Sequence, residues 1–187
     1  KPGKPKVLKI DSAHASVSFL RLLFGTVRVS FGADAFGGEL SGVTSASDEG
    51  RQLEVELEDL DLGQAPLFAD IVGLPLSGKL NGTIDLLMPE EKLAKADGKI
   101  SLKVAELSAG DGKAKIRDTI ALPRLEAGDL TLEAEAKTGN LKITNFSANG
   151  PDLKLESDGT LRLRDPYDTS LLNLNVSFKF QDRYTNK

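Results

Sequence analysis

The sequence predicts an all-β fold, a strongly curved antiparallel β-sheet folded into an elongated groove, with one short helix. Three observations predict it. Apolar and polar residues alternate along several segments, turn-forming residues separate those segments, and glycines recur in phase with the apolar positions.

The alternation locates the strands. In residues 76–86, Leu76, Leu80 and Ile84 share one face, and Lys79 and Asp85 occupy the other. Such a strand meets water on one side and apolar groups on the other. The same pattern occurs in residues 27–35, 52–58, 99–104, 130–136, 153–163 and 172–180.

Turn chemistry separates these segments. Glycine combined with Asp, Asn, Thr or Pro occurs at residues 48–50, 97–98, 110–112, 138–140 and 149–152. These residues favour tight turns. Because antiparallel neighbours need only short connections, we expect hairpins and no crossover helices.

One segment has helical features. Residues 66–72 begin with Pro66, carry apolar residues at near-helical spacing and are followed by Gly73. This pattern predicts a helix of about two turns. Residues 90–95 are expected to form a turn at most, and residues 181–184 are expected to be a charged strand end.

A single helix cannot cover so many one-sided strands, so their apolar faces must cover one another. A closed barrel, a two-sheet sandwich and a sheet folded lengthwise into a groove all achieve this. Gly78, Gly82 and Gly159 lie in phase with the apolar residues, where a missing side chain permits sharp bending. The glycines therefore favour the curved sheet.

The domain organisation is simple. Residues 1–6 are expected to be a basic linker, and residues 7–187 a single domain. The pattern G-T-[I/L]-x-L-x-x-P occurs at residues 82–89 and again at 159–166, an offset of 159 − 82 = 77 residues. It suggests an internal repeat that extends one sheet.

Composition excludes several functions. The chain of 187 residues has no Cys, a single His and a net charge of −4. Thiol chemistry is therefore absent, and nothing predicts the clustered positive face that nucleic acid requires. We expect no enzyme activity, no catalytic residues, no cofactor and no metal ion.

Two polar features of the sequence are candidate sites. Five carboxylates lie within residues 54–61, a density compatible with calcium, but the spacing is not that of an EF-hand, and a solvated strand face is the preferred interpretation. His14 has neighbouring Ser and Asp residues, yet a triad is defined in space and not by sequence proximity.

The apolar strand face is the feature with functional potential. An open groove there could hold lipid, because each methylene removed from water contributes about 0.8 kcal/mol. The alternative is that the same side chains form an ordinary core. The expected groove lining is Leu76, Leu80, Ile84, Leu102, Leu132, Leu155, Leu161, Leu174 and Phe178.

The order of glycine, proline and alternating leucine resembles a known family. It is carried by residues 120–130, 141–143, 146–150, 152–155 and 159–163, and more widely by residues 74–82. Most of residues 40–180 resemble the periplasmic domain of the type II secretion system protein N (GspN) family. They are more distantly similar to AsmA-like envelope proteins.

The resemblance implies a β-taco fold and a periplasmic domain attached to the bacterial inner membrane by an N-terminal anchor absent from this fragment. It implies a structural or interaction module in protein secretion, with other secretion-system proteins as partners. The alternative function is an AsmA-like groove that binds phospholipid or conveys it between membranes. It supplies no catalytic residues.

Overall fold

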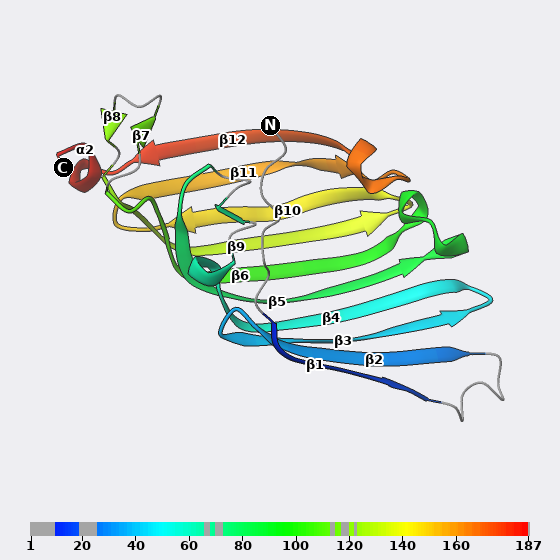
Figure 1. Ribbon diagram of the computed structural model, residues 1–187. Helices are drawn as coiled ribbons and strands as arrows, with labels where there is room; N and C mark the ends of the chain where they lie inside the picture. Colours follow the sequence, from blue (N-terminus) through cyan, green and yellow to red (C-terminus); the bar gives the residue numbers. More distant parts are fainter. Residues whose placement is uncertain are drawn as a thin grey trace, which may run out of the picture.

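Ten antiparallel strands form one sheet in the computed structural model, which describes residues 10–18, 26–65, 68–69, 73–112, 115–116, 120–121 and 123–186. The strand order is β1-β2-β3-β4-β5-β6-β9-β10-β11-β12, so every strand pairs with its neighbours in sequence apart from a short insertion (Figure 1). The strands of this sheet are β1 (Ile10–Val17), β2 (Val27–Ala35), β3 (Gly38–Ser47), β4 (Gly50–Asp61), β5 (Leu76–Met88), β6 (Asp97–Ala109), β9 (Leu125–Lys137), β10 (Asn140–Asn149), β11 (Leu153–Arg162) and β12 (Leu171–Phe180).

The smaller elements lie in the connections. The two-stranded insertion β7 (Lys115–Ile116) and β8 (Ile120–Ala121) separates β6 from β9. Four 3-10 helices, η2 (Leu62–Gln64), η3 (Pro89–Glu91), η4 (Leu93–Lys95) and η5 (Tyr167–Thr169), and the helix α2 (Asp182–Thr185) complete the described elements.

The sheet is open among the described residues. The first strand, β1, pairs with β2 and the last strand, β12, pairs with β11, and no pairing joins β1 to β12. Figure 1 shows these two strands at opposite edges. The closed barrel and the two-sheet sandwich that the sequence left open are therefore not formed.

All seven predicted strand segments lie in strands, apart from Leu163 just beyond the end of β11, and their antiparallel pairing is confirmed. Three strands of the ten-stranded sheet, β1, β3 and β10, were not predicted, and neither was the short pair β7 and β8. The segments of β1 and β3 are rich in Ser, Ala and Gly, so their alternation in hydrophobicity is weak. Pairing with stronger neighbours makes them strands, because β-propensity depends on context.

The helical expectations have mixed outcomes. Within residues 66–72, Phe68 and Ala69 are helical, and the others lie outside the described residues, as does the linker 1–6. Residues 90–95 form two 3-10 turns. The strand end expected at residues 181–184 is wrong, because Asp182–Thr185 is the short helix α2.

The register places one apolar face across the whole sheet. Residues directly opposite one another in a sheet share a face. Leu57 of β4 lies opposite Gly82 of β5, which lies opposite Leu102 of β6, and Leu102 lies opposite Leu132 of β9. Further along the sheet Leu155 of β11 lies opposite Phe178 of β12.

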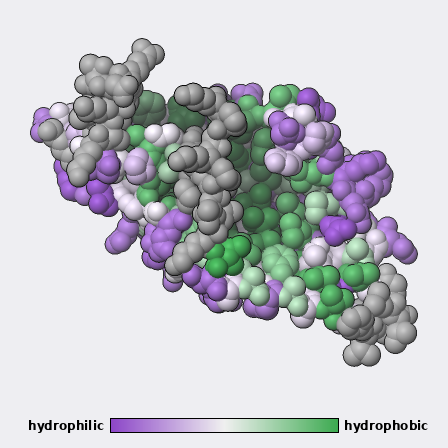
Figure 2. All heavy atoms as spheres, viewed as in Figure 1, coloured by the Kyte–Doolittle hydropathy of each residue, from purple (hydrophilic) through white to green (hydrophobic). Residues whose placement is uncertain are grey.

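Two buried clusters lie on this face. The first is centred on Leu86, Ala134, Ala136, Leu141 and Ile143, and the second on Leu60, Leu62, Leu80 and Val104. Figure 2 shows hydrophobic residues gathered along the middle of the visible face, with hydrophilic residues around them. The core therefore belongs to one side of a single sheet.

The glycines in the two copies of the repeated motif have equivalent close neighbours, although only Gly82 has a positive φ. A Cβ at Gly82 of β5 would overlap the carbonyl oxygen of Ser101 and lie 2.8 Å from Cδ2 of Leu102. A Cβ at Gly159 of β11 would overlap the carbonyl oxygen of Asn173 and lie 2.8 Å from Cδ2 of Leu174. In each case a leucine of the next strand packs over the glycine. The 77-residue repeat as a whole stays a prediction.

A buried carboxylate joins three connections at one end of the sheet. Asp152, fully buried, accepts a hydrogen bond from the Glu126 backbone N–H at 2.8 Å, and its Oδ1 lies 3.7 Å from Nε of Arg183 in α2. The Asp152 carbonyl also accepts from the Gln181 N–H at 2.9 Å. These contacts hold the ends of β12, β11 and β9 together.

Candidate functional site

The apolar face contains a cavity of about 390 Å³ at the end of the sheet where β5, β9 and β11 begin. All sixteen lining residues are apolar. They are Leu62, Phe68, Leu76, Leu80, Leu102, Val104, Leu107, Ala109, Leu125, Ala127, Leu130, Leu132, Phe146, Ala148, Leu153 and Leu155. No side chain in the wall can donate a hydrogen bond or carry a charge, so an occupant would be held by apolar contact alone.

The connection between β4 and β5 supplies part of the wall. Asp61 at the end of β4 accepts from the Gly63 backbone N–H at 2.9 Å and from the Gln64 side chain at 3.2 Å. These bonds cap η2 and turn Leu62 inward, where it is 5% exposed and packs with Leu80. The chain therefore turns over the apolar face at this end.

Local backbone irregularities shape the same region. The β5–β6 ladder shifts register between Ser77 and Lys79, and the β6–β9 ladder shifts between Val104 and Ser108. Such bulges bend a strand and increase its twist. Gly78, at the first shift, has φ +141, a conformation that residues with a side chain rarely adopt.

The nine residues expected to line a groove occupy two regions of the face and its edge. Leu76, Leu80, Leu102, Leu132 and Leu155 line the cavity. Ile84, Leu161 and Leu174 pack against the first buried cluster, towards the other end of the strands. Phe178 lies on β12, is 60% exposed, and meets Phe180 edge-to-face with ring centroids 5.6 Å apart.

Sequence reasoning missed several wall residues. Leu62 and Phe68 lie in the β4–β5 connection, where no strand alternation marks them. Ala127 and Ala148 are 4% and 3% exposed, and small side chains contribute little to an alternation pattern. The two-residue spacing of Leu125 and Ala127 was a usable signal for the start of β9, although the register shift before Leu130 puts them out of phase with the later apolar residues of the strand.

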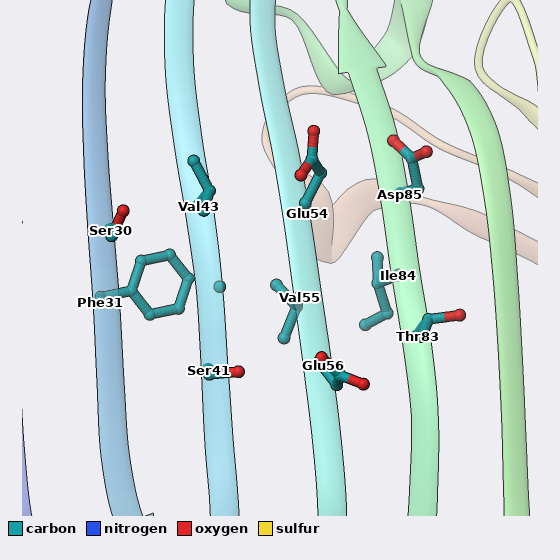
Figure 3. A pocket seen from close by; sticks show the side chains of 11 residues that line it. Ser30, Phe31, Ser41, Val43, Glu54, Val55, Glu56, Thr83, Ile84 and Asp85 are labelled. Atoms are coloured by element: carbon teal, nitrogen blue, oxygen red, sulfur yellow. The ribbon is translucent and has the colours of Figure 1, made fainter.

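The opposite face of the sheet is polar and acidic over β3, β4 and β5. A shallow hollow of about 490 Å³ lies there (Figure 3). Glu54 of β4 is directly opposite Asp85 of β5, and Glu58 is directly opposite Glu39 of β3. Like charges placed opposite one another repel, so this face favours full solvation.

The acidic segment 54–61 divides into separate roles. Asp61 caps η2, and the Asp59 backbone N–H donates to Oδ1 of Asn81 at 3.0 Å. Among the described residues, no group of three or more His, Asp or Glu side chains is placed to hold a metal ion. The calcium interpretation therefore gains no support.

The remaining titratable features lie away from the cavity. His14 of β1 lies over Gly32 of β2, whose Cβ, if present, would meet the imidazole. Hydrogen bonds from Lys92 and Lys95 lower the pKa of Glu90 from 4.5 to about 2, and all three side chains are solvent-exposed at the η3–η4 turn. Neither feature contacts the apolar wall.

Comparison with known proteins gave no match. No family model, no curated protein and no solved structure matches it. In the described part of the chain, no helix has the length and apolar character needed to cross a membrane.

Proposed function

We propose that this protein binds the acyl chains of a phospholipid along the apolar face of its sheet, without catalysis. In this proposal the open sheet folds lengthwise into the groove that the sequence predicts, the β-taco shape that the resemblance implies. The single observation that carries the proposal is the cavity whose sixteen wall residues are all apolar. An apolar cavity on an open face is unusual in a protein without a ligand or partner for it.

The curvature of the groove is supported by the glycines and bulges. Gly78 and Gly82 have φ values of +141 and +156, and register shifts occur in the β4–β5, β5–β6 and β6–β9 ladders. Bulges and glycine kinks are the devices by which sheets acquire strong curvature.

The size of the cavity sets a limit on affinity. With roughly 30 Å³ for a water-sized or methylene-sized group, 390 Å³ holds about a dozen methylenes. At about 0.8 kcal/mol each, their burial gives about 10 kcal/mol before any cost. Association itself costs roughly 4–15 kcal/mol. Useful binding therefore requires the acyl chain of the lipid to extend beyond the cavity along the apolar face.

The test uses two variants at adjacent residues of β9 that face opposite sides. Leu132→Trp places an indole in the cavity, and Glu133→Trp places it on the exposed polar face. Because the chain has no native Trp, each variant also carries a single fluorescence reporter. Protein purified from bacteria is extracted with organic solvent and analysed by mass spectrometry, and binding of a phospholipid with fluorescent acyl chains is titrated.

We expect near-stoichiometric phospholipid with the unmodified protein and with Glu133→Trp, and at least tenfold weaker binding with Leu132→Trp. Absence of lipid from the unmodified protein, together with no binding in the titration, contradicts the proposal. Equal binding by the two variants would mean that lipid is held elsewhere.

The second proposed function is a non-enzymatic interaction module of the type II secretion system in the periplasm, held at the inner membrane in the full-length protein. It is supported by the residue resemblance and by the exposed edge strand β12, since exposed edges can pair with other strands. The test is deletion of the gene in its own host, with export of an extracellular enzyme as readout. Normal export in the deletion strain contradicts this function.

A further inference from the structure

The edge strand β12 (Leu171–Phe180) lacks the features that normally protect a sheet edge. It pairs with β11 over ten consecutive residues without a register shift, and Lys179 is its one charged residue. Natural edges are usually blunted by charges, proline, bulges or short length. A long, regular and apolar edge strand is a surface for pairing with another strand.

The side chains of β12 are also unusually exposed. Leu172, Val176 and Phe178 are 60%, 51% and 60% exposed, and Phe180 is 41% exposed. The register places them on the apolar side of the sheet, opposite Leu161, Ser157, Leu155 and Leu153 of β11. A strand added beside β12 would remove both the free backbone groups and this apolar surface from water.

The other edge differs in this respect. The β1–β2 pairing shifts register between Ile10 and Ser12, and β1 carries Asp11 and His14. A bulge and ionisable side chains oppose strand addition. The chain therefore has one edge suited to pairing, and an interface that uses one edge twice closes into a dimer and does not grow into a fibre.

We propose that two copies of this chain pair through β12, antiparallel, about a two-fold axis at Val176. A two-fold axis perpendicular to the sheet keeps the apolar faces of both copies on the same side. Leu174 then faces Phe178 of the second copy, and Leu172 faces its Phe180, so every cross-strand pair on that side is apolar. Such pairs are the units that stabilise a sheet.

Charge also favours this register. With Val176 on the axis, Lys179 faces Asn173 of the second copy, and Asn175 faces its Ser177. No like charges become neighbours, although both strands have the same sequence. The result is one twenty-stranded sheet with an uninterrupted apolar face.

This inference does not depend on the lipid proposal. It adds to the second proposed function by naming a second copy of the chain as the partner of the β12 edge. If the purified protein is monomeric but deletion of its gene still impairs secretion, the self-pairing is wrong and the secretion function stands.

The first test is sedimentation velocity over a range of concentrations. We expect a monomer–dimer equilibrium, and we expect Val176→Lys to weaken dimerisation at least 100-fold, because two ammonium groups would then face each other on the axis. The control is Val17→Lys, at a 45% exposed residue of the opposite edge, which should leave dimerisation unchanged. A monomer at all concentrations, or equal weakening by both variants, overturns the proposal.

The second test is independent of the stability of Val176→Lys. The chain has no Cys, so Val176→Cys introduces a single thiol that meets its own copy on the axis. Under mild oxidation we expect disulfide-linked dimers at least tenfold more abundant than for Val17→Cys. Equal cross-linking of the two variants overturns the two-fold register, whereas a monomer that binds an unrelated partner strand would show that β12 pairs with another protein.

Discussion

The glycines of the repeated motif give the sharpest test of how the sheet is packed. A Cβ at Gly82 would collide with the carbonyl oxygen of Ser101 and lie 2.9 Å from Cα of Leu102, and Gly82 has φ +156. Gly82→Ala therefore meets two obstacles, a backbone collision and a disfavoured backbone conformation. Gly159→Ala meets the collision without the disfavoured φ.

Two further glycines separate the two effects. Gly112 has φ +74 and open space where a Cβ would lie, so Gly112→Ala meets only the conformational cost. Gly63 has neither a positive φ nor a neighbour closer than 3.1 Å, the Oδ1 of Asp61. The four Gly→Ala substitutions therefore cover both effects together, the collision alone, the disfavoured φ alone, and neither effect.

The expected magnitudes follow from these combinations. Overpacking costs about 1–3 kcal/mol, and a disfavoured backbone conformation costs a similar amount of about 1–3 kcal/mol. Both costs are offset in part, because Gly→Ala lowers the conformational entropy of the unfolded chain and so stabilises the fold by roughly 0.4–1 kcal/mol. We therefore expect a loss of about 3 kcal/mol at Gly82, losses of about 1 kcal/mol at Gly159 and at Gly112, and little change at Gly63.

The overpacking cost of Gly159→Ala should lie at the lower end of the range of about 1–3 kcal/mol for a structural reason. Its obstacle belongs to β12, which is paired on one side only, whereas the obstacle at Gly82 belongs to β6, which is held between β5 and β9. An edge strand can shift more easily than a central one.

The assay is urea unfolding of each variant, followed by circular dichroism, with the free energy of unfolding taken at constant m-value. A loss at Gly82 no larger than at Gly112 would refute the reasoning, because it would mean that β5 and β6 approach less closely than described.

Three other predictions concern a buried carboxylate, the apolar face and an exposed ion pair. Asp152→Ala should lower the free energy of unfolding by about 1–3 kcal/mol, since it removes the acceptor of a buried N–H; unchanged urea unfolding contradicts this. Leu80→Asp should abolish folding or lipid uptake, because an unpaired buried carboxylate is very costly. Thr83→Asp on the exposed face should leave folding and lipid uptake intact, with only a small loss of stability from repulsion by Glu56 opposite; circular dichroism and the lipid titration decide. The pKa of Glu90 is lowered to about 2 by Lys92, so the stability it contributes is present above pH 4.5 and is lost as pH falls towards 2. Glu90→Gln should flatten acid unfolding in that window and should lose the same small contribution at neutral pH, because the carboxylate is solvent-exposed. An unaltered acid profile would show that the pair contributes nothing.

Much of the strand layout could be predicted because its signal is local. Residues 27–35 coincide with β2, and the segments 76–86 and 172–180 lie within β5 and β12. Strands with weak alternation were missed, as β3 shows: its apolar side bears Leu40, Gly42, Thr44 and Ala46, a mixture that carries little periodic signal. β3 is a strand because β2 and β4 pair with it on both sides.

The candidate site was predictable only in part. Alternation placed Leu80 and Leu102 on the apolar face, but it could not distinguish Leu155, which lines the cavity, from Ile84, which packs against the first buried cluster. That difference depends on bulges and on the turn capped by Asp61, which bring Leu62 over one end of the face. Neither can be deduced from a period of two.

By itself the sequence determined that this chain forms antiparallel strands with one apolar side, because a strand directs successive side chains to opposite faces and the residues alternate accordingly. Only the tertiary structure decided that the ten strands form one open sheet in chain order, where the cavity lies, and that β12 is left exposed at an edge. Those outcomes depend on which strands pair and in which register, and pairing energy comes from neighbours distant in sequence.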